Sequence, residues 1–167
     1  MLFRSPIAIW AAGGFGKSTR YDWYFIEKNL LGKIPDALLG TRKVLLSKVG
    51  VAITDKKAVG INGVPQIVEK QAIGENVFFV IPDNDNDYEL QVIKSMFMTK
   101  TVRYLMSITQ KDLYVRGFEN IPDYTYFLPL LNGQLVSDDW IYKHFGFSEE
   151  LVKYIESHVS PKIDIRK

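Results

Sequence analysis

The sequence predicts an α+β protein with strands in its first half and helices in its second. Apolar or aromatic runs with β character recur up to residue 81, separated by glycine-rich or polar stretches. After residue 88 the apolar residues recur at helical spacing, as Leu90, Ile93 and Phe97 do. The 167 residues are enough for one domain with a core. We expect a single domain over residues 1–167, with a mixed or antiparallel sheet in the N-terminal half and a helical hairpin at 134–167.

A β-hairpin is expected near the start of the chain. Residues 7–10 are an apolar run that ends in the glycine-rich residues 11–16, and the aromatic-rich residues 21–26 follow. Glycines interrupt regular structure, whereas aromatic side chains favour strands. Two strands that flank a glycine-rich connection are typical of a hairpin.

Three further strands are expected before residue 82. They are a strand core with basic ends at 43–48, a second run at 66–72, and a third run at 76–81. The third is the clearest candidate for a buried strand, because it is almost wholly apolar and Pro82 stops it.

Helices follow, with recognisable start and stop signals. A polar turn at residues 83–87 leads into a helix at 88–98, and a second helix is expected at 101–109. Ser137 should cap a short helix that has Asp138 and Asp139 in its first turn and ends at Gly146, and Ser148 should cap a last helix. The apolar face expected for that last helix consists of Leu151, Val152, Ile155 and Val159. Loops are expected at Pro122, Pro129 and Asn132-Gly133.

The net charge of +2 conceals an uneven distribution along the chain. Residues 1–60 hold ten basic and four acidic side chains, a net of +6, whereas 61–125 carry −3 and 126–167 carry −1. A basic first third can bind a polyanion, and acidic parts would face away from it. A solvated surface with chance clustering is the alternative that charge alone leaves open.

The amino-acid composition limits the cellular compartment and the kinds of site that we expect. There is no cysteine, which excludes disulfides and thiolate zinc sites and fits a reducing compartment. No apolar run approaches the roughly 20 residues of a bilayer span. We expect a cytoplasmic protein without a signal peptide and without a membrane partner.

Residues 11–18 resemble a relaxed phosphate-binding loop, with Lys17 and Ser18 in the places of its lysine and hydroxyl ligand. Such a loop must open a helix, whose N-terminus binds the phosphate. Residues 19–25 are dense in aromatics and form poor helix material. A glycine turn is therefore favoured, and a nucleotide-binding enzyme remains the alternative.

Other patterns with possible chemistry have structural explanations. Residues 83–87 begin like a calcium loop, but Tyr88 and Lys94 stand where glycine and glutamate are required. The two histidines, His144 and His158, lie far from any metal-ligand pattern and are expected on helix surfaces. We expect no catalytic residue and no metal site.

Several segments carry a family resemblance. Residues 99–105 are TKTVRYL, residues 136–150 are VSDDWIYKHFGFSEE, and residues 154–157 are YIES; the strands at 43–48 and 76–81 lie upstream. Over about residues 40–160 the chain resembles the C-terminal regions of bacterial type II restriction enzymes and adenine-specific DNA methyltransferases. It departs from them at residues 49–52, and residues 1–39 match weakly.

The resemblance implies a target recognition domain of a restriction-modification enzyme, which recognises the DNA site for a methyltransferase domain upstream. Neither the Asn-Pro-Pro-Tyr methyltransferase motif nor a nuclease motif is found. The chain is therefore expected to be a non-catalytic piece that needs no cofactor. The parent restriction endonuclease or methyltransferase is expected to use S-adenosylmethionine and Mg²⁺. The implied partners are double-stranded DNA and the methyltransferase or nuclease domain.

DNA contacts require basic side chains for phosphates, together with groups that can bind base edges. Lys56 and Lys57 are the leading candidates, because loops on a rigid sheet commonly carry recognition. Arg103 has an alternative role as the partner of an internal acid. The complete set of expected contacts is Lys43, Lys48, Lys56, Lys57, Lys17, Ser18, Arg20, Lys100 and Arg103.

The helix pair at residues 137–160 is not expected to be a DNA-binding helix-turn-helix. Its second helix opens with Glu149 and Glu150, where a recognition helix would meet bases and phosphates. A packing hairpin is favoured. A module that docks on a methyltransferase subunit remains a third possible function.

Overall fold

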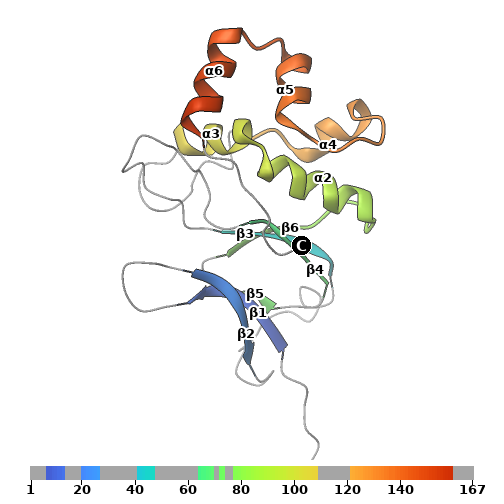
Figure 1. Cartoon of the computed structure of the whole chain (residues 1–167). Helices are drawn as coiled ribbons and strands as arrows, with labels where there is room; N and C mark the ends of the chain where they lie inside the picture. The colour runs from blue at the N-terminus through green and yellow to red at the C-terminus, as the bar shows by residue number, and fades with distance from the viewer. Residues whose placement is uncertain are drawn as a thin grey trace, which may run out of the picture.

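The computed structural model describes residues 7–13, 20–26, 41–47, 64–69, 72–73, 77–108 and 121–159. They form three layers, which Figure 1 shows from bottom to top. One three-stranded sheet, in the order β2-β1-β5, lies below a second sheet, β4-β3-β6. The helices cover the second sheet, so the protein is of the α+β class, as the sequence predicts.

The first sheet contains the predicted hairpin. β1 (Ile7–Gly13) pairs antiparallel with β2 (Arg20–Ile26), from Ile7 opposite Ile26 to Gly13 opposite Arg20. β5 (Ala72–Ile73) adds a short parallel pairing to the other edge of β1. This sheet is therefore mixed.

The second sheet is antiparallel and corrects two expectations. β3 (Lys43–Ser47) is its central strand, between β4 (Gln66–Val68) and β6 (Val77–Val80). The strand predicted at 66–72 is divided, because β4 and β5 belong to different sheets. β6 is not a buried strand: Phe79 is 39% exposed. Among the described strands it pairs with β3 alone, and Phe78 and Val80 pack against the core while Phe79, on the opposite face, is exposed.

Six helical segments follow the strands in the described part of the chain. They are α2 (Asp87–Met98), α3 (Lys100–Ile108), α4 (Tyr124–Phe127), the 3₁₀ turn η3 (Leu128–Leu130), α5 (Asp138–Phe145) and α6 (Glu149–His158). The four longer helices were predicted within about two residues. Pro129 was expected in a loop but lies in η3, where proline fits the first turn of a helix. In α6, Ile155 and Val159 are buried as predicted, but Leu151 is 37% exposed.

The caps predicted at Ser137 and Ser148 are present, and Asn86 caps α2 in the same way. The side chains of Asn86, Ser137 and Ser148 accept hydrogen bonds from the backbone N–H groups of Glu89, Trp140 and Leu151. Gly146 ends α5 with a φ of 64°, a left-handed conformation that favours glycine. These local signals fix the helix boundaries before any tertiary contact is considered.

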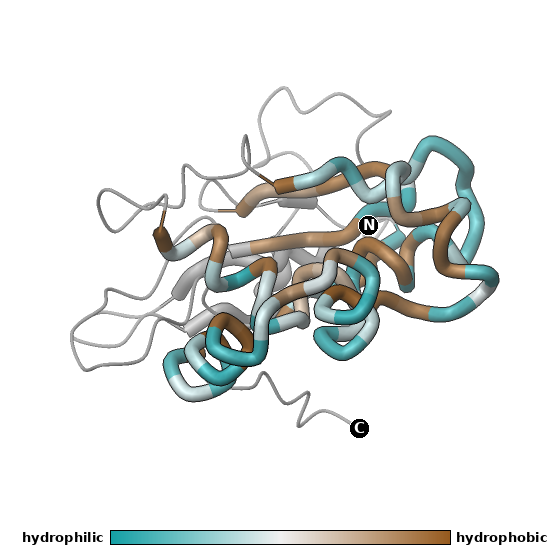
Figure 2. Tube along the Cα trace, turned by 90° about the horizontal axis from the view of Figure 1, so that it is seen from above, coloured by the Kyte–Doolittle hydropathy of each residue, from teal (hydrophilic) through white to brown (hydrophobic). Residues whose placement is uncertain are grey.

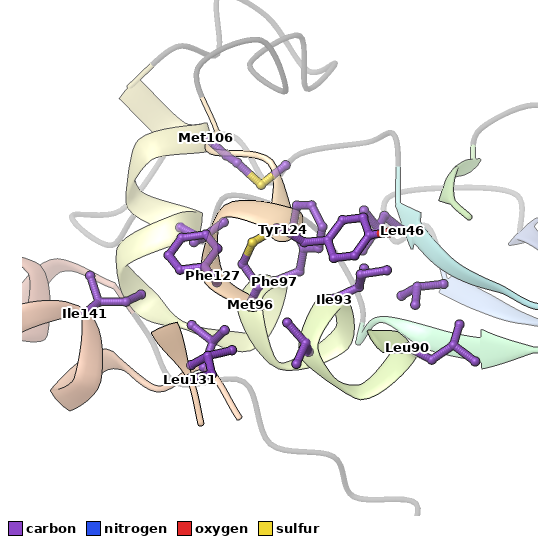
Figure 3. Close-up of a cluster of buried hydrophobic side chains, with 14 residues drawn as sticks. Leu46, Leu90, Ile93, Met96, Phe97, Met106, Tyr124, Phe127, Leu131 and Ile141 are labelled. Atoms are coloured by element: carbon purple, nitrogen blue, oxygen red, sulfur yellow. The ribbon is translucent and has the colours of Figure 1, made fainter. Parts of the chain in front are cut away.

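The hydrophobic core lies between the second sheet and the helices. Figure 2, seen from above the helices, shows hydrophobic and hydrophilic residues alternating along them. Figure 3 shows hydrophobic side chains of this core, which come from several elements. Leu46 lies on β3, Ile93 and Phe97 lie on α2, and Phe127 lies on α4. Each of these four side chains is at most 3% exposed. Burial of this apolar surface is the main source of stability for this half of the molecule.

The polar turn before α2 is fixed by a buried carboxylate. Glu89 is 4% exposed and accepts hydrogen bonds from Asn84 Nδ2 at 2.7 Å, Asn86 Nδ2 at 3.0 Å and Tyr124 OH at 3.2 Å. Burial by itself would raise the pKa of Glu89, but these hydrogen bonds outweigh it and lower the pKa. The calcium-like residues 83–87 thus serve as turn and cap.

Candidate functional site

A network of polar side chains joins the start of α3 to α5 and α6. Asp138, in the first turn of α5, accepts hydrogen bonds from the backbone N–H of Lys100 and of Thr101, both at 2.9 Å. It also accepts one from Thr101 Oγ1 at 2.8 Å. The first N–H groups of a helix have no partner within the helix, so this carboxylate caps α3 from a distant segment.

The same network continues to α6 through an ion pair. Lys100 Nζ contacts Glu156 Oε2, and Tyr142 OH donates to Glu156 Oε1 at 3.0 Å. The hydrogen bond from Lys100 is the main cause that lowers the pKa of Glu156, whereas burial raises the pKa of Tyr142. We call Lys100, Thr101, Asp138, Tyr142 and Glu156 the cap network.

The cap network unites the three segments that carry the family resemblance in the second half of the chain. Lys100 and Thr101 belong to TKTVRYL, Asp138 and Tyr142 to VSDDWIYKHFGFSEE, and Glu156 to YIES. Their side chains hold α3, α5 and α6 together. These segments therefore form a packing element, which agrees with the expected role of residues 137–160.

Arg103 lies inside the protein. Its exposed fraction is zero, and Nε donates to Thr99 O at 3.1 Å. Nη1 and Nη2 have no hydrogen-bond partner within the part of the chain that the structure describes. Burial lowers the pKa of Arg103 to about 10, and the nearby charge of Asp138 opposes that shift. The internal alternative for Arg103 is therefore favoured, with Asp138 as the acid that acts on it.

Lys43 is also buried, with no exposed surface. Its Nζ donates to Thr41 O at 2.9 Å, and burial lowers its pKa. Lys43 and Arg103 were both expected at a DNA interface. A side chain without exposed surface does not reach a DNA phosphate in this conformation, so burial counts against these two predicted contacts.

The other expected contacts divide into three groups. Lys100 is 18% exposed, and its charge is paired with Glu156. Arg20 opens β2, opposite Gly13, at the end of the hairpin where the glycine-rich connection begins. The remaining five, Lys17, Ser18, Lys48, Lys56 and Lys57, lie outside the described residues. The structure places Lys100 and Arg103 on the same helix, α3.

The hairpin bears directly on the phosphate-loop alternative. A phosphate-binding loop connects a strand to a helix. Here β1 ends at Gly13, and the chain is already in the antiparallel strand β2 at Arg20. Residues 20–26 are therefore not the helix that this chemistry requires, which supports the glycine-turn interpretation.

Charge is distributed unevenly between the layers. We define the helical layer as residues 81–108 and 121–159, which hold α2 to α6. It carries five basic and ten acidic side chains, and eight of the acids but only two of the bases are exposed. The two exposed bases are Lys143 and Lys153, and Lys153 lies 3.9 Å from Glu149. This layer presents a negative surface.

Among the described residues, no group of three or more metal-ligating side chains comes together. His144 is exposed on α5, and His158 is half-buried at the end of α6 with Nδ1 2.8 Å from Tyr154 O. No described helix has both the length and the apolar character needed to cross a membrane.

Comparison with protein-family models, with curated proteins and with solved structures found no match. The family resemblance therefore rests on the sequence segments alone.

Sequence reasoning missed the two main features of the helical layer. It assigned Asp138 to the first turn of its own helix, whereas the carboxylate caps α3, 37 residues earlier. It gave Tyr142 and Glu156 no role. No local signal could have revealed these contacts, because the partners are distant in the sequence. An aspartate beside a second aspartate in a helix first turn was the only hint.

Proposed function

We propose that this protein is a DNA target recognition domain of a restriction-modification enzyme, non-catalytic by itself, that binds double-stranded DNA through its strand-rich first third. Its parent is then an adenine-specific methyltransferase, a type II restriction endonuclease or both. The resemblance of residues 99–157 supports the family, and the cap network supports a structural role for those residues.

The observation that carries the proposal is the uneven charge along the chain, which has a basic first third and an acidic helical layer. DNA is a dense polyanion, and binding to it depends mainly on basic side chains near phosphates. The helical layer exposes eight acids and two bases, whereas residues 1–60 hold ten bases and four acids. Figure 1 shows β1 and β2, from the basic third, at the end of the molecule away from the helices. A duplex is attracted to the strand end and repelled by the helical end.

Six of the expected DNA contacts in the first third of the chain remain candidates. Lys17, Ser18 and Arg20 lie in or beside the connection of the hairpin. Lys48, Lys56 and Lys57 follow β3 in the sequence. Segments between strands commonly carry recognition because the sheet holds them in place. Lys100 and Arg103 have internal partners, so we assign them to the support of the fold.

The test measures fluorescence anisotropy of a labelled mixed-sequence duplex at two salt concentrations. Binding should weaken as salt rises, because each phosphate contact contributes roughly 0.9 to the slope of log affinity against log salt. The double variant Lys56→Ala/Lys57→Ala should lose about tenfold in affinity and show a shallower salt slope.

The matched control is Lys143→Ala/Lys153→Ala, which removes the same charge from the exposed surface of the helical layer. It should leave DNA affinity within about twofold. Equal losses for both double variants would mean that net charge, rather than the strand end, governs binding. Absence of binding at low salt would reject the proposed function.

A further inference from the structure

Two large aromatic side chains are exposed where α4 meets α5. Tyr126 is 53% exposed and Phe145 is 43% exposed. Their rings are stacked, with centroids 6.5 Å apart and planes inclined by 23°. Figure 1 shows α4 and α5 side by side in the helical layer, away from β1 and β2. DNA recognition at the strand end gives these rings no role.

The exposed rings pack against one buried ring. Phe127 is 2% exposed, and its ring lies 5.8 Å from Tyr126, 6.4 Å from Phe145 and 5.7 Å from Trp140. Trp140 in turn stacks on His144, with centroids 4.7 Å apart. We call Tyr126, Phe127, Trp140, His144 and Phe145 the aromatic surface.

Fixed, exposed aromatic rings have the properties of a binding surface. A ring that is already ordered loses little conformational entropy when a partner covers it. Exposed clusters of apolar side chains commonly mark interaction sites, and tyrosine is among the residues that dominate binding energy at interfaces. The aromatic surface therefore suits an interaction that buries Tyr126 and Phe145.

Charge indicates the chemistry of the partner. Asp123, the exposed N-cap of α4, lies three residues before Tyr126. On the other side, Phe147 lies 6.5 Å from Phe145 and is followed by the exposed Glu149 and Glu150. These three exposed acids outnumber the exposed bases Lys143 and Lys153 of α5 and α6, of which Lys153 lies 3.9 Å from Glu149. The net negative charge attracts basic groups and disfavours nucleic acid, since complementary charge selects the partner and speeds encounter.

We propose that the aromatic surface docks a basic, amphipathic peptide segment of a protein partner. Leucine or phenylalanine side chains of the segment pack on Tyr126 and Phe145, and its lysines or arginines face Asp123, Glu149 and Glu150. This proposal is independent of the DNA-binding function, because it uses the opposite end of the molecule.

The experiment titrates the whole chain into a panel of short, labelled amphipathic peptides with leucine or phenylalanine on one face and lysine on the other. A matched panel carries glutamate in place of lysine. The lysine panel should contain binders, and their glutamate counterparts should bind about tenfold more weakly. Absence of binding across the lysine panel, or equal binding of both panels, overturns the proposal.

Variants locate the binding surface. Tyr126→Ala/Phe145→Ala should weaken peptide binding about tenfold. The control Leu135→Ala removes another exposed apolar side chain, 47% exposed, outside the aromatic surface and should leave binding unchanged. Glu149→Gln/Glu150→Gln keeps every ring and should weaken binding several-fold, which separates charge recognition from a folding defect.

Three further outcomes decide between partners. Duplex DNA binding should be unchanged in Tyr126→Ala/Phe145→Ala, so failure of the DNA proposal and failure of this one are distinguishable. Displacement of the peptide by a single-stranded oligonucleotide would replace the protein partner with nucleic acid. Self-association in sedimentation experiments that the same double variant abolishes would identify a second copy as the occupant. Either of these two results overturns the proposal.

Discussion

The strand-rich and helical parts of this protein use their charged residues in different ways. In the helical layer, Asp138, Lys100 and Glu156 bond to one another or to backbone, and they hold α3, α5 and α6 together. The exposed remainder of that layer is acidic. In the first third of the chain, bases outnumber acids by ten to four. The segments that carry the family resemblance therefore hold the fold together, and they need not be the segments that bind a ligand.

The comparison also separates two kinds of basic side chain. Lys43 and Arg103 are wholly buried and bond to backbone carbonyls of Thr41 and Thr99. A buried cation loses hydration, and its pKa falls, as it does for both of these residues. Lys143 and Lys153 are exposed but belong to the acidic layer. The number of basic residues thus says little about an interface until burial is known.

The largest expected effect is a loss of stability caused by a substitution at the centre of the helical layer. Phe127→Ala should lower the free energy of unfolding by about 3–5 kcal/mol, because it leaves a cavity among buried side chains of α2, α4 and α5. Urea unfolding followed by circular dichroism measures the change. The neighbouring Tyr126→Ala, at an exposed position, should change stability by roughly 0.5 kcal/mol or less. Similar losses for both variants would show that the core does not centre on Phe127.

The second effect tests the cap network. Asp138→Ala removes the acceptor for two backbone N–H groups of α3 and should cost about 1–3 kcal/mol. Asp139→Ala removes the same charge from the same helix turn, where the side chain is exposed, and should lower the free energy of unfolding by only about 0.3–1 kcal/mol. Urea unfolding of both variants, with hydrogen exchange of Lys100 and Thr101, measures the difference. Equal costs would assign Asp138 to its own helix, as the sequence alone suggested.

The third effect is a dependence of stability on pH. The pKa of Glu89 is lowered in the folded protein, so its contribution is present above the unfolded value of 4.5 and is lost as the pH falls through the lower, folded value. Stability should therefore decline below about pH 4.5. Glu89→Gln should flatten that decline in urea unfolding measured at a series of pH values. Glu150→Gln, at an exposed position, serves as the control, and an equal flattening there would remove the special role of Glu89.

The smallest expected effect concerns DNA. Arg103→Met replaces a buried guanidinium by an apolar side chain of similar length, and DNA affinity should stay within about twofold, because Arg103 has no exposed surface. Anisotropy on the mixed-sequence duplex measures it, with Lys56→Ala/Lys57→Ala as the sensitive comparison. A tenfold loss of DNA affinity for Arg103→Met would place Arg103 at the DNA interface. The contrast between a DNA-binding first third and a helical layer that does not bind DNA would then be wrong.

Much of the secondary structure could be predicted because its signals are local. The hairpin followed from two strand-like runs around glycines, and β1 and β2 have that arrangement. Ser137, Gly146 and Ser148 marked helix ends, because capping acts through neighbouring backbone groups. The candidate site was harder to predict. Whether a lysine on a strand faces solvent depends on what covers that strand, and the sequence near Lys43 contains no such information.

By itself, the sequence determined the order of strands and helices, the caps of α5 and α6, and the uneven charge along the chain. These features depend on residues a few positions apart or on simple counts. Only the tertiary structure decided that β4 and β5 belong to different sheets, that Lys43 and Arg103 are internal, and that Asp138 caps α3. Each of these depends on contacts between distant segments, and hydrophobic packing of the layers, rather than any local pattern, brings those segments together.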